Sequence, residues 1–442
     1  MHELRFATPI ACLLAAGCQT YAPAPVDLAA HAQAFADRIP DPTALRASAL
    51  DDGLDLNEAR HVALVFNAEL RVARLRAGVV QASVDTAGRW DDPEFRGDFA
   101  RILEGVPHPW LAGGAIGLTL PITGRPSLEK ELAASRHGEA LLQARQAEAA
   151  VLNALDEAWV TWSTARLSLQ LLEDLVARLD GLEAMATRLS AAHEISQIEA
   201  RTFTLAKVAR QAELLDVRSK LRDAELEIRR LLGLAPDRDL ALVPSVRIDV
   251  RVAAGERRRA LLDESPRVAL ARRRHEVAER NLALAVRKQW PELTLFPGFQ
   301  EEDAQPRAAL GFALPIPLWN RNAREIADAR ADREQAAEAL RASLEGATQD
   351  LARAELRSDA ARERRALVDA QLVPLAEQQL LDAQRLVELG RLDTLLILDA
   401  LTRSHEAKVL ALRAALAEAE AAVAINSLFW PASIAGEGAE AR

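Results

Sequence analysis

The side chains that most often carry out catalysis or bind metals are few and dispersed in this sequence. Its eight histidines are scattered, and no two lie three or four residues apart, the spacing that places two ligands on one helix face. Glu58 and His61 form an isolated Glu-x-x-His pair, whereas a di-iron bundle needs two such motifs and further glutamates. Neither a phosphate-binding loop nor a nucleophile elbow is present. The sequence therefore predicts a protein that is not an enzyme and needs no cofactor or metal ion.

One cysteine lies in a pattern typical of covalent lipid attachment. Residues 6–16 are an apolar run too short to span a bilayer as a helix, and small residues lead from it to Cys18. Residues 14–18 (LAAGC) are similar to the cleavage site of bacterial lipoproteins, whose cysteine thiol carries the lipid anchor. Gln19, rather than an aspartate, follows the cysteine, which favours the outer membrane as destination. The alternative is an ordinary signal peptide with an incidental cysteine.

The composition is that of a protein built from long helices. Half of the 442 residues are hydrophobic but only 4% are aromatic, and alanine, leucine, glutamate and arginine dominate. The formal net charge is −10, with both signs interspersed and no basic cluster, so nucleic acid is not an expected partner. Two cysteines are too few for a disulfide framework or a thiolate-rich metal site.

From residue 57 onward the chain is predicted to contain one structure twice. Residues 115–122 (AIGLTLPI) match residues 309–316 (ALGFALPI), about 195 residues later, and helical segments on either side repeat at a similar separation. A nearly constant separation indicates duplication. The predicted parts are a signal peptide (1–17), a lipidated, extended arm (18–56), a first repeat (57–240), a linker (241–256), a second repeat (257–430) and a disordered tail (431–442).

Each repeat includes a segment with the period of a β-strand. The matching segments alternate large apolar residues with Gly, Ala and Thr, and a second strand precedes each of them. We therefore expect strand hairpins at about 92–122 and 291–318. Half of the chain's aromatic residues fall in the windows 90–122 and 290–319, which contain these hairpins and their ends, as in the interfacial girdle of an outer-membrane barrel. A small soluble sheet with an ordinary core is the alternative.

Polar side chains occupy one face of the first predicted strand. Glu94, Arg96 and Asp98 alternate with Phe95 and Phe99. If the apolar face contacts lipid, alternation places the polar residues in a barrel lumen. Glu94, Arg96 and Asp98 are therefore the predicted lumen residues.

The remainder is predicted to be helical. Each repeat is expected to hold an opening helix (about 57–84 and 257–286), a long helix (127–190 and 322–388) and, after a tight turn, a return helix (195–232 and 392–429). Opening and return helices together match the length of the long helix, so we expect them to stack end to end beside it. Pro374 should kink the second long helix.

The return helices carry apolar residues at alternating spacings of three and four, which predicts coiled-coil seams. The predicted seams are Leu214, Val217, Leu221, Ala224, Ile228 and Leu231 in the first repeat, and Val409, Leu412, Leu416, Ala419 and Val423 in the second.

Together these features resemble a TolC-type outer-membrane efflux protein over essentially all of residues 57–430. The resemblance rests on the paired Gly-x-x-x-Leu-Pro-Ile strands (117–122 and 311–316), the following PLWNRN (317–322), the Ala-rich helix after it and the turn LGRLD (389–393). It implies a mainly α fold with a small transmembrane β part. In this TolC-like fold, duplicated long-helix hairpins form an α-barrel, and three copies contribute four strands each to a trimeric 12-strand β-barrel, since four strands alone are too few to close one.

The resemblance also implies a function. Such proteins are passive conduits from the periplasm to the exterior in tripartite efflux systems. A homotrimer would sit in the outer membrane, lipid-anchored and with a long periplasmic portion. It would dock onto a periplasmic adaptor (membrane fusion protein) and, through it, onto an inner-membrane pump of the RND type.

Functional residues follow from the same resemblance. Adaptors dock at the hairpin tips, typically at a glycine flanked by apolar residues, and a reversal between helices needs a residue that tolerates positive φ. The second tip fits with Leu389, Gly390, Arg391 and Leu392. The first tip, with His193, Glu194 and Ile195, departs from the pattern because it lacks a glycine.

The inner gate of such channels uses rings of carboxylates just past the second tip. Asp399 falls at one such position, whereas the companion position is Leu396, so the sequence predicts at most a single acidic ring. A solvated helix aspartate is the alternative for Asp399.

The exported substrate is predicted from the motif at 314–322 (LPIPLWNRN), which is more similar to the cobalt–zinc–cadmium branch than to the multidrug branch. This favours heavy-metal cations with an RND-type pump. A multidrug or type I secretion channel is the alternative within the class. A periplasmic coiled-coil adaptor or scaffold lipoprotein is the alternative from another class.

Overall fold

A computed structural model describes residues 21–38, 53–103, 105, 107, 109–302, 305–389 and 393–431. Cys18 with the predicted signal peptide, and Gly390, Arg391 and Leu392 of the second tip, lie outside the described residues. The chain divides into two compact units, one ending at Pro40 and the other beginning at Asp41.

The first unit contains helix α2 (Leu28–Ala36), where the sequence predicts an extended arm. The helix begins where the Asp27 carboxylate accepts hydrogen bonds from the amides of Ala29 and Ala30, both at 3.0 Å. This cap, followed by a run rich in alanine, makes the segment helical despite the prolines on either side of it.

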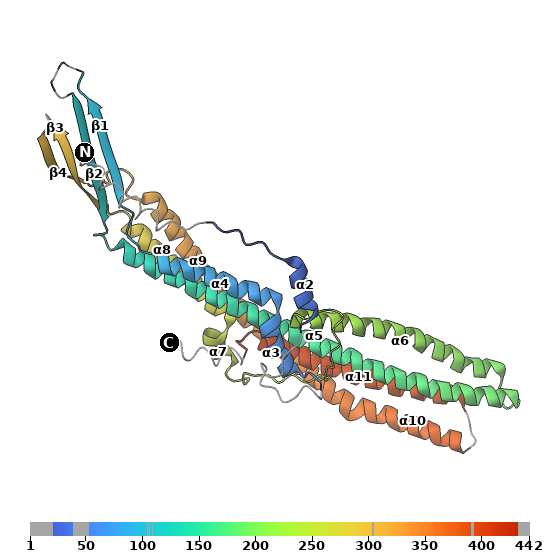
Figure 1. The fold of residues 1–442 in the computed structure, drawn as a ribbon. Helices are drawn as coiled ribbons and strands as arrows, with labels where there is room; N and C mark the ends of the chain where they lie inside the picture. The colour runs from blue at the N-terminus through green and yellow to red at the C-terminus, as the bar shows by residue number, and fades with distance from the viewer. Residues whose placement is uncertain are drawn as a thin grey trace. The chain divides into compact units, whose positions relative to one another are not determined.

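The second unit contains one antiparallel sheet with strand order β1-β2-β3-β4 (Figure 1). The strands are β1 (Glu94–Arg101), β2 (Trp110–Leu120), β3 (Leu293–Glu302) and β4 (Gln305–Ala313). Both predicted hairpins form, and β2 pairs with β3 to join the two repeats. The last strand ends earlier than predicted because Pro315 and Pro317 follow and cannot donate backbone hydrogen bonds.

The long helices form as the sequence predicts, with one interruption. The first is the unbroken 67-residue α5 (Arg125–Ala191). In the second repeat, α9 (Ala323–Leu367) passes into a π-helical segment, η2 (Val368–Leu372), before α10 (Val373–Glu388). Pro374 lacks an amide proton and its ring would clash with the carbonyl one turn earlier, and a π segment relieves both problems. The return helices are α6 (Gln197–Leu232) and α11 (Thr394–Asn426).

Each opening helix is two helices rather than one. In the first repeat α3 (Leu56–Phe66) and α4 (Ala68–Thr86) meet at Asn67, whose side-chain oxygen caps α4 by accepting from the amides of Glu69 and Leu70. In the second repeat α7 (Arg257–Glu264) and α8 (Pro266–Arg287) meet at Ser265. Ser265 adopts an extended conformation because a residue before proline is excluded from the helical region.

These breaks lie where opening and return helices meet. The buried Asn67 side chain donates to the carbonyl of Leu231 at the end of α6, at 2.9 Å. In the second repeat the amide of Trp430, just past α11, donates to the carbonyl of Glu264 at 3.0 Å. The predicted end-to-end arrangement of opening and return helices is thus present, with α4 and α6 both packed along α5.

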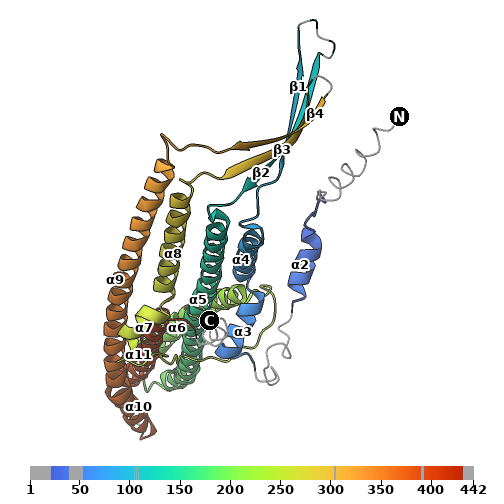
Figure 2. The ribbon, with the colours of Figure 1, turned by 90° about the vertical axis from the view of Figure 1, so that its left-hand side faces the viewer.

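The helices near the sheet form a layer. Helices α4, α5, α8 and α9 lie side by side in that order, each in contact with the next (Figure 2). Farther from the sheet, a second row of helices runs in the order α6, α5, α11 and α10, each in contact with the next. Helices α4, α6, α9 and α10 are therefore the edges of these layers. None of the described helices has both the length and the apolar character that spanning a membrane would need.

The seam predicted in the first repeat is confirmed and the second is only partly correct. Leu214, Leu221, Ile228 and Leu231 are buried, with Val217 and Ala224 packed against them. In α11 only Ala419 and Val423 of the predicted residues are buried. More than half of its other buried positions carry small side chains, which allow close approach of the neighbouring helices: Thr394, Ala400, Ser404, Ala407, Ala414, Ala421 and Ala422. The larger buried side chains are Ile397, Leu401, His405, Ile425 and Asn426.

Candidate functional site

The sheet has two chemically different faces. The pairing register places Glu94, Arg96 and Asp98 opposite Gly117, Ala115 and Gly113, so these six residues share one face. We call it the small face, because Gly, Ala and Thr predominate on it. The other, apolar face carries exposed side chains: Phe95, Phe99, Ile116, Leu118, Phe299, Leu310 and Phe312.

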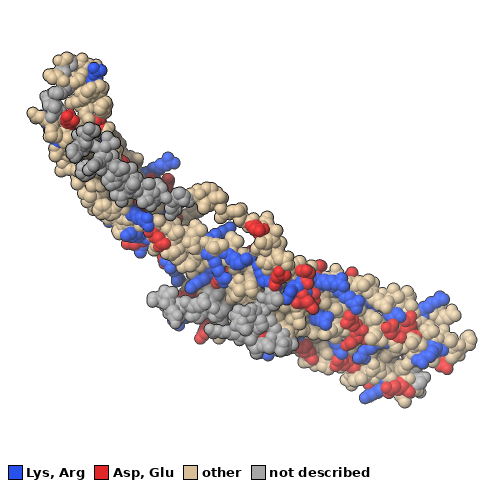
Figure 3. Space-filling model, viewed as in Figure 1, with Lys and Arg blue, Asp and Glu red and all other residues tan. Residues whose placement is uncertain are grey.

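The apolar face is unusual for its exposure to solvent in a single copy. Phe95 and Phe312 are 78% and 76% exposed. Figure 3 shows that charged side chains crowd the helices, whereas the surface over the strands is mostly uncharged in this view. A large exposed apolar patch marks a surface that contacts lipid or another protein.

The first hairpin tip contains a strained residue that the sequence did not reveal. His193 has φ of 60°, a left-handed conformation that favours glycine. The His193 amide donates a hydrogen bond to the Ser190 carbonyl at 3.1 Å, and the Glu194 amide donates one to the Leu189 carbonyl at 2.9 Å. This pair of bonds is a Schellman motif, which ends α5 without a glycine. The tip is therefore a defined turn despite its departure from the expected pattern.

Capping groups start the helix after each tip. Ser196 and Glu199 form a capping box on α6, with Ser196 Oγ accepting from the Glu199 amide and the Glu199 carboxylate accepting from the Ser196 amide. These hydrogen bonds to Ser196 lower the pKa of Glu199. At the second tip, Asp393 accepts from the amides of Leu395 and Leu396 to start α11. The Ser-x-x-Glu pattern at 196–199 was the available sequence signal for the first turn.

Both tips present apolar side chains to solvent. At the first tip Ile198 is exposed, and at the second Leu389 and Leu395 are exposed. Asp399 lies one turn into α11 from Leu395, is exposed, and pairs with Arg403 on the same helix at 2.7 Å. The predicted gate residue is therefore accessible and has a local cation as its partner.

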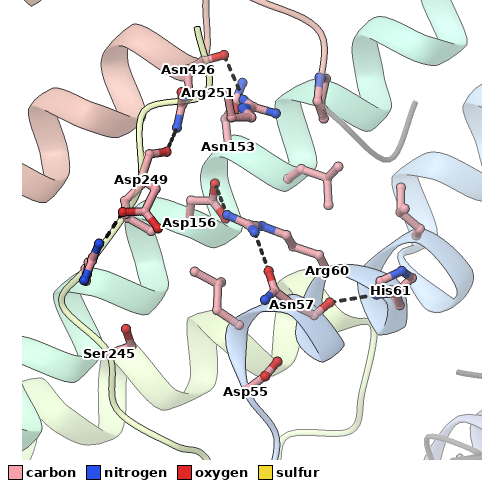
Figure 4. Close-up of a pocket in the computed structure, with 16 residues that line it drawn as sticks. Asp55, Asn57, Arg60, His61, Asn153, Asp156, Ser245, Asp249, Arg251 and Asn426 are labelled. Atoms are coloured by element: carbon pink, nitrogen blue, oxygen red, sulfur yellow. Dashed lines mark hydrogen bonds and ion pairs between the residues drawn. The ribbon is translucent and has the colours of Figure 1, made fainter. Parts of the chain in front are cut away.

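A cavity of about 580 Å³ lies where α3, α5 and the segment 245–251 converge (Figure 4). At its wall Arg60 on α3 forms two hydrogen bonds with the Asp156 carboxylate on α5, at 2.8 and 2.9 Å. The Asp156 side chain is only 5% exposed. Sequence reasoning missed this ion pair, since its members are far apart in the chain. It fixes the short helix α3 against the long helix.

No group of three or more His, Cys, Asp or Glu side chains that could hold a metal ion occurs within the described ranges. The lone Glu58–His61 motif does not add to such a group: the Glu58 carboxylate accepts from the Asp55 amide, and His61 Nδ1 lies 2.8 Å from the Asn57 carbonyl.

The environment of His405 predicts that the packing of α11 is sensitive to pH. The residue is buried, and burial is the main reason that its pKa is lowered from 6.5; Arg210 lowers it further, whereas Glu213 and Glu406 oppose the shift. Because the unfolded chain binds the proton more readily, the contribution of His405 to stability should be constant above about pH 6.5 and fall as the pH decreases from there towards the folded-state pKa. We expect His405→Gln to flatten this part of the curve, measured as melting temperature against pH from 7.5 to 5. Parallel curves for the two proteins would contradict the prediction.

Comparison with solved structures identifies the fold. One match is CusC, from a study of the conformational changes that accompany its folding and transmembrane channel formation. It superimposes with a TM-score of 0.73 at 16% identity, and the match covers 86% of this chain and 93% of the CusC chain. The outer membrane protein VceC from Vibrio cholerae matches with a TM-score of 0.69 at 18% identity, covering 84% and 95%. The open MtrE outer membrane channel of Neisseria gonorrhoeae matches with a TM-score of 0.68 at 17% identity, covering 84% and 88%.

The chain therefore has the TolC-like fold of outer-membrane channels, mostly helical with a small antiparallel sheet. At sequence identities of 16–18%, the similarity to these solved structures concerns the fold alone. The sequence itself matches no protein-family model and no curated protein.

Proposed function

We propose that three copies of this chain form an outer-membrane channel that conducts solutes passively from the periplasm to the exterior. The observation that carries the proposal is the four-stranded sheet with one exposed apolar face, one small, polar face and two outer strands, β1 and β4, each paired on one side only among the described residues. Unpaired strand edges are unstable in lipid. Joining β4 of one copy to β1 of the next removes every edge and places the apolar face outwards.

The helical layers support the same assembly. Their edge helices carry apolar side chains that remain exposed in a single copy. On one edge these are Val72, Leu75 and Val79 of α4 and Ile198, Leu205 and Leu215 of α6; on the other they are Leu356 of α9 and Leu375 and Leu381 of α10. Lateral contact between copies would bury both edges at once, continuing the wall of helices below the strands into a tube.

The partners and the cargo are further parts of the proposal. The tips, with His193, Glu194 and Ile195 at one and Leu389 at the other, are the proposed docking points for a periplasmic adaptor that links the channel to an inner-membrane RND pump. Cys18 is the proposed lipid anchor. The motif at 314–322 is the basis for heavy-metal cations as cargo, and a deletion strain with reduced tolerance of cobalt, zinc or cadmium would support this choice over multidrug or type I export.

The experiment that tests the proposed function is isolation of the protein from outer-membrane fractions followed by planar-bilayer recording. We expect a trimer on gels that dissociates only on heating, and discrete conductance steps after reconstitution. A protein that is extracted from the membrane without detergent, migrates as a monomer on gels and gives no conductance would instead support the alternative of a periplasmic scaffold.

Asp399 is the proposed residue of the inner gate. Three copies of this carboxylate would form a ring near the tips and attract cations. We expect Asp399→Ala to raise single-channel conductance or weaken block by divalent cations. Glu406→Ala, an acidic residue farther along the same helix, is the control. Unchanged conductance and unchanged block in Asp399→Ala would reject the ring.

A further inference from the structure

We propose that Arg96 is a fixed positive charge in the channel wall that lowers the preference of the strand region for cations over anions. The inference rests on the proposed function, because it requires the small face of the sheet to line the lumen. It adds a residue that determines ion selectivity, and it is carried by a cluster formed by Arg96, Phe296 and Gly117.

The small face is nearly flat over most of its area. Between its charged residues it carries mainly side chains no larger than a methyl group, which project little into a lumen. These are Ala100, Gly113, Ala115, Gly117, Gly298, Ala309, Gly311 and Ala313. Among the described strand residues, Phe296 is the one aromatic side chain on this face.

Phe296 lies across the neighbouring strand. A Cβ added to Gly117 would lie 2.7 Å from Cε1 and 3.2 Å from Cδ1 of the phenyl ring, so the ring occupies the space above this glycine. Glycine is required here because the aromatic ring takes the place of its missing side chain. The ring reaches from β3 over β2 towards β1.

The Arg96 guanidinium lies on this ring. Its Cζ is 4.0 Å from the centroid of Phe296, which is the geometry of a cation–π contact. On its own strand, Nη2 of Arg96 is 3.5 Å from Oε2 of Glu94. The arginine is therefore held from two directions, yet 57% of its side chain remains exposed to solvent. These two contacts fix the position of the guanidinium, and its charge remains exposed to solvent.

Arg96 adds positive charge to this face. Among the side chains that the structure describes, Glu94 and Asp98 carry negative charge on the small face, and Arg96 and Arg307 carry positive charge. A guanidinium is a permanent positive charge at physiological pH. Removal of Arg96 takes one positive charge from each copy and hence three from around the lumen, which should favour cations.

The test is the reversal potential of reconstituted channels in a KCl gradient, with dilute salt at about 0.1 M on one side, where the screening length is about 10 Å. We expect Arg96→Gln to raise the K⁺ to Cl⁻ permeability ratio by roughly twofold or more. Arg96→Lys, which keeps the charge, should remain near the wild-type ratio. Arg101→Gln is the matched control, because Arg101 lies on the same strand but on the other face, beside Trp110.

A second variant keeps the test independent of how Arg96→Gln folds. Arg96→Cys can be modified in the assembled channel with a cationic or an anionic methanethiosulfonate. The cationic reagent should restore the wild-type ratio, and the anionic reagent should raise the cation preference further.

The inference is overturned if conducting channels of Arg96→Gln keep the wild-type ratio, if Arg101→Gln shifts it equally, or if the two reagents act alike on Arg96→Cys. Wild-type protein that never conducts would overturn the proposed function itself. The two failures are therefore distinguishable.

Discussion

Replacement of Asp156 by alanine is expected to lower the free energy of unfolding by about 2–3 kcal/mol, less than the cost for a fully buried ion pair because 31% of the Arg60 side chain is exposed. The Asp156 carboxylate is almost fully buried and accepts both hydrogen bonds that orient Arg60. Without it, the Arg60 guanidinium loses its carboxylate partner at the wall of the cavity, and α3 loses these two hydrogen bonds to α5. Thermal unfolding of the purified protein, followed by circular dichroism, should show a clear decrease in melting temperature.

Asp249→Ala is the matched control for this prediction. Asp249 lines the same cavity and pairs with Arg247, but their side chains are 80% and 84% exposed. An exposed pair contributes at most about 1 kcal/mol. We also expect the double variant Arg60→Ala/Asp156→Ala to lose less than the sum of its single variants, because the two side chains act together. Equal stability of Asp156→Ala and Asp249→Ala would show that the buried pair does not hold α3 in place.

Replacement of Leu310 by arginine is expected to abolish the proposed trimer, which dissociates on heating, in outer-membrane fractions. Leu310 lies on the apolar face of β4 and is 73% exposed in a single copy. In water, such a substitution would change stability little, within about 0.5 kcal/mol. If the apolar face contacts lipid, as proposed, each arginine costs up to about 2–4 kcal/mol, and three copies would multiply the penalty.

Ala309→Arg provides the comparison, because Ala309 is the adjacent residue of the same strand and lies on the small face opposite Gly298. Its side chain would extend into an aqueous lumen, so the trimer should persist at close to wild-type abundance. Gel mobility with and without heating measures both variants. Loss of the trimer in both, or in neither, would contradict the assignment of the apolar face to lipid.

Local sequence pattern was sufficient for the elements of the fold. The alternation at 94–99 and in the matching segments 115–122 and 309–316 predicted both hairpins, because a strand turns each successive side chain to the opposite face. The absence of proline between residues 127 and 235 allowed an unbroken α5, and Pro374 marked the site of the π-helical segment. These features depend on neighbouring residues alone.

The polar contacts of the site could not be predicted from local sequence pattern. Arg60 and Asp156 meet only because α3 folds back against α5, and Asn67 reaches Leu231 only because two helices end at the same place. His193 adopts a conformation that its residue type disfavours, since the two hydrogen bonds of the Schellman motif hold it there. No pattern in the neighbouring sequence specifies such contacts.

The sequence by itself determined most of the strands and helices and which faces of the strands are apolar, because backbone geometry and side-chain alternation are set over a few residues. Tertiary structure alone decided the order in which the strands and helices lie side by side, the buried face of α11 and the placing of Arg96 on Phe296. Each of these depends on contacts between segments that are distant in the chain, where the space left by one residue, as at Gly117, is filled by another from a different repeat.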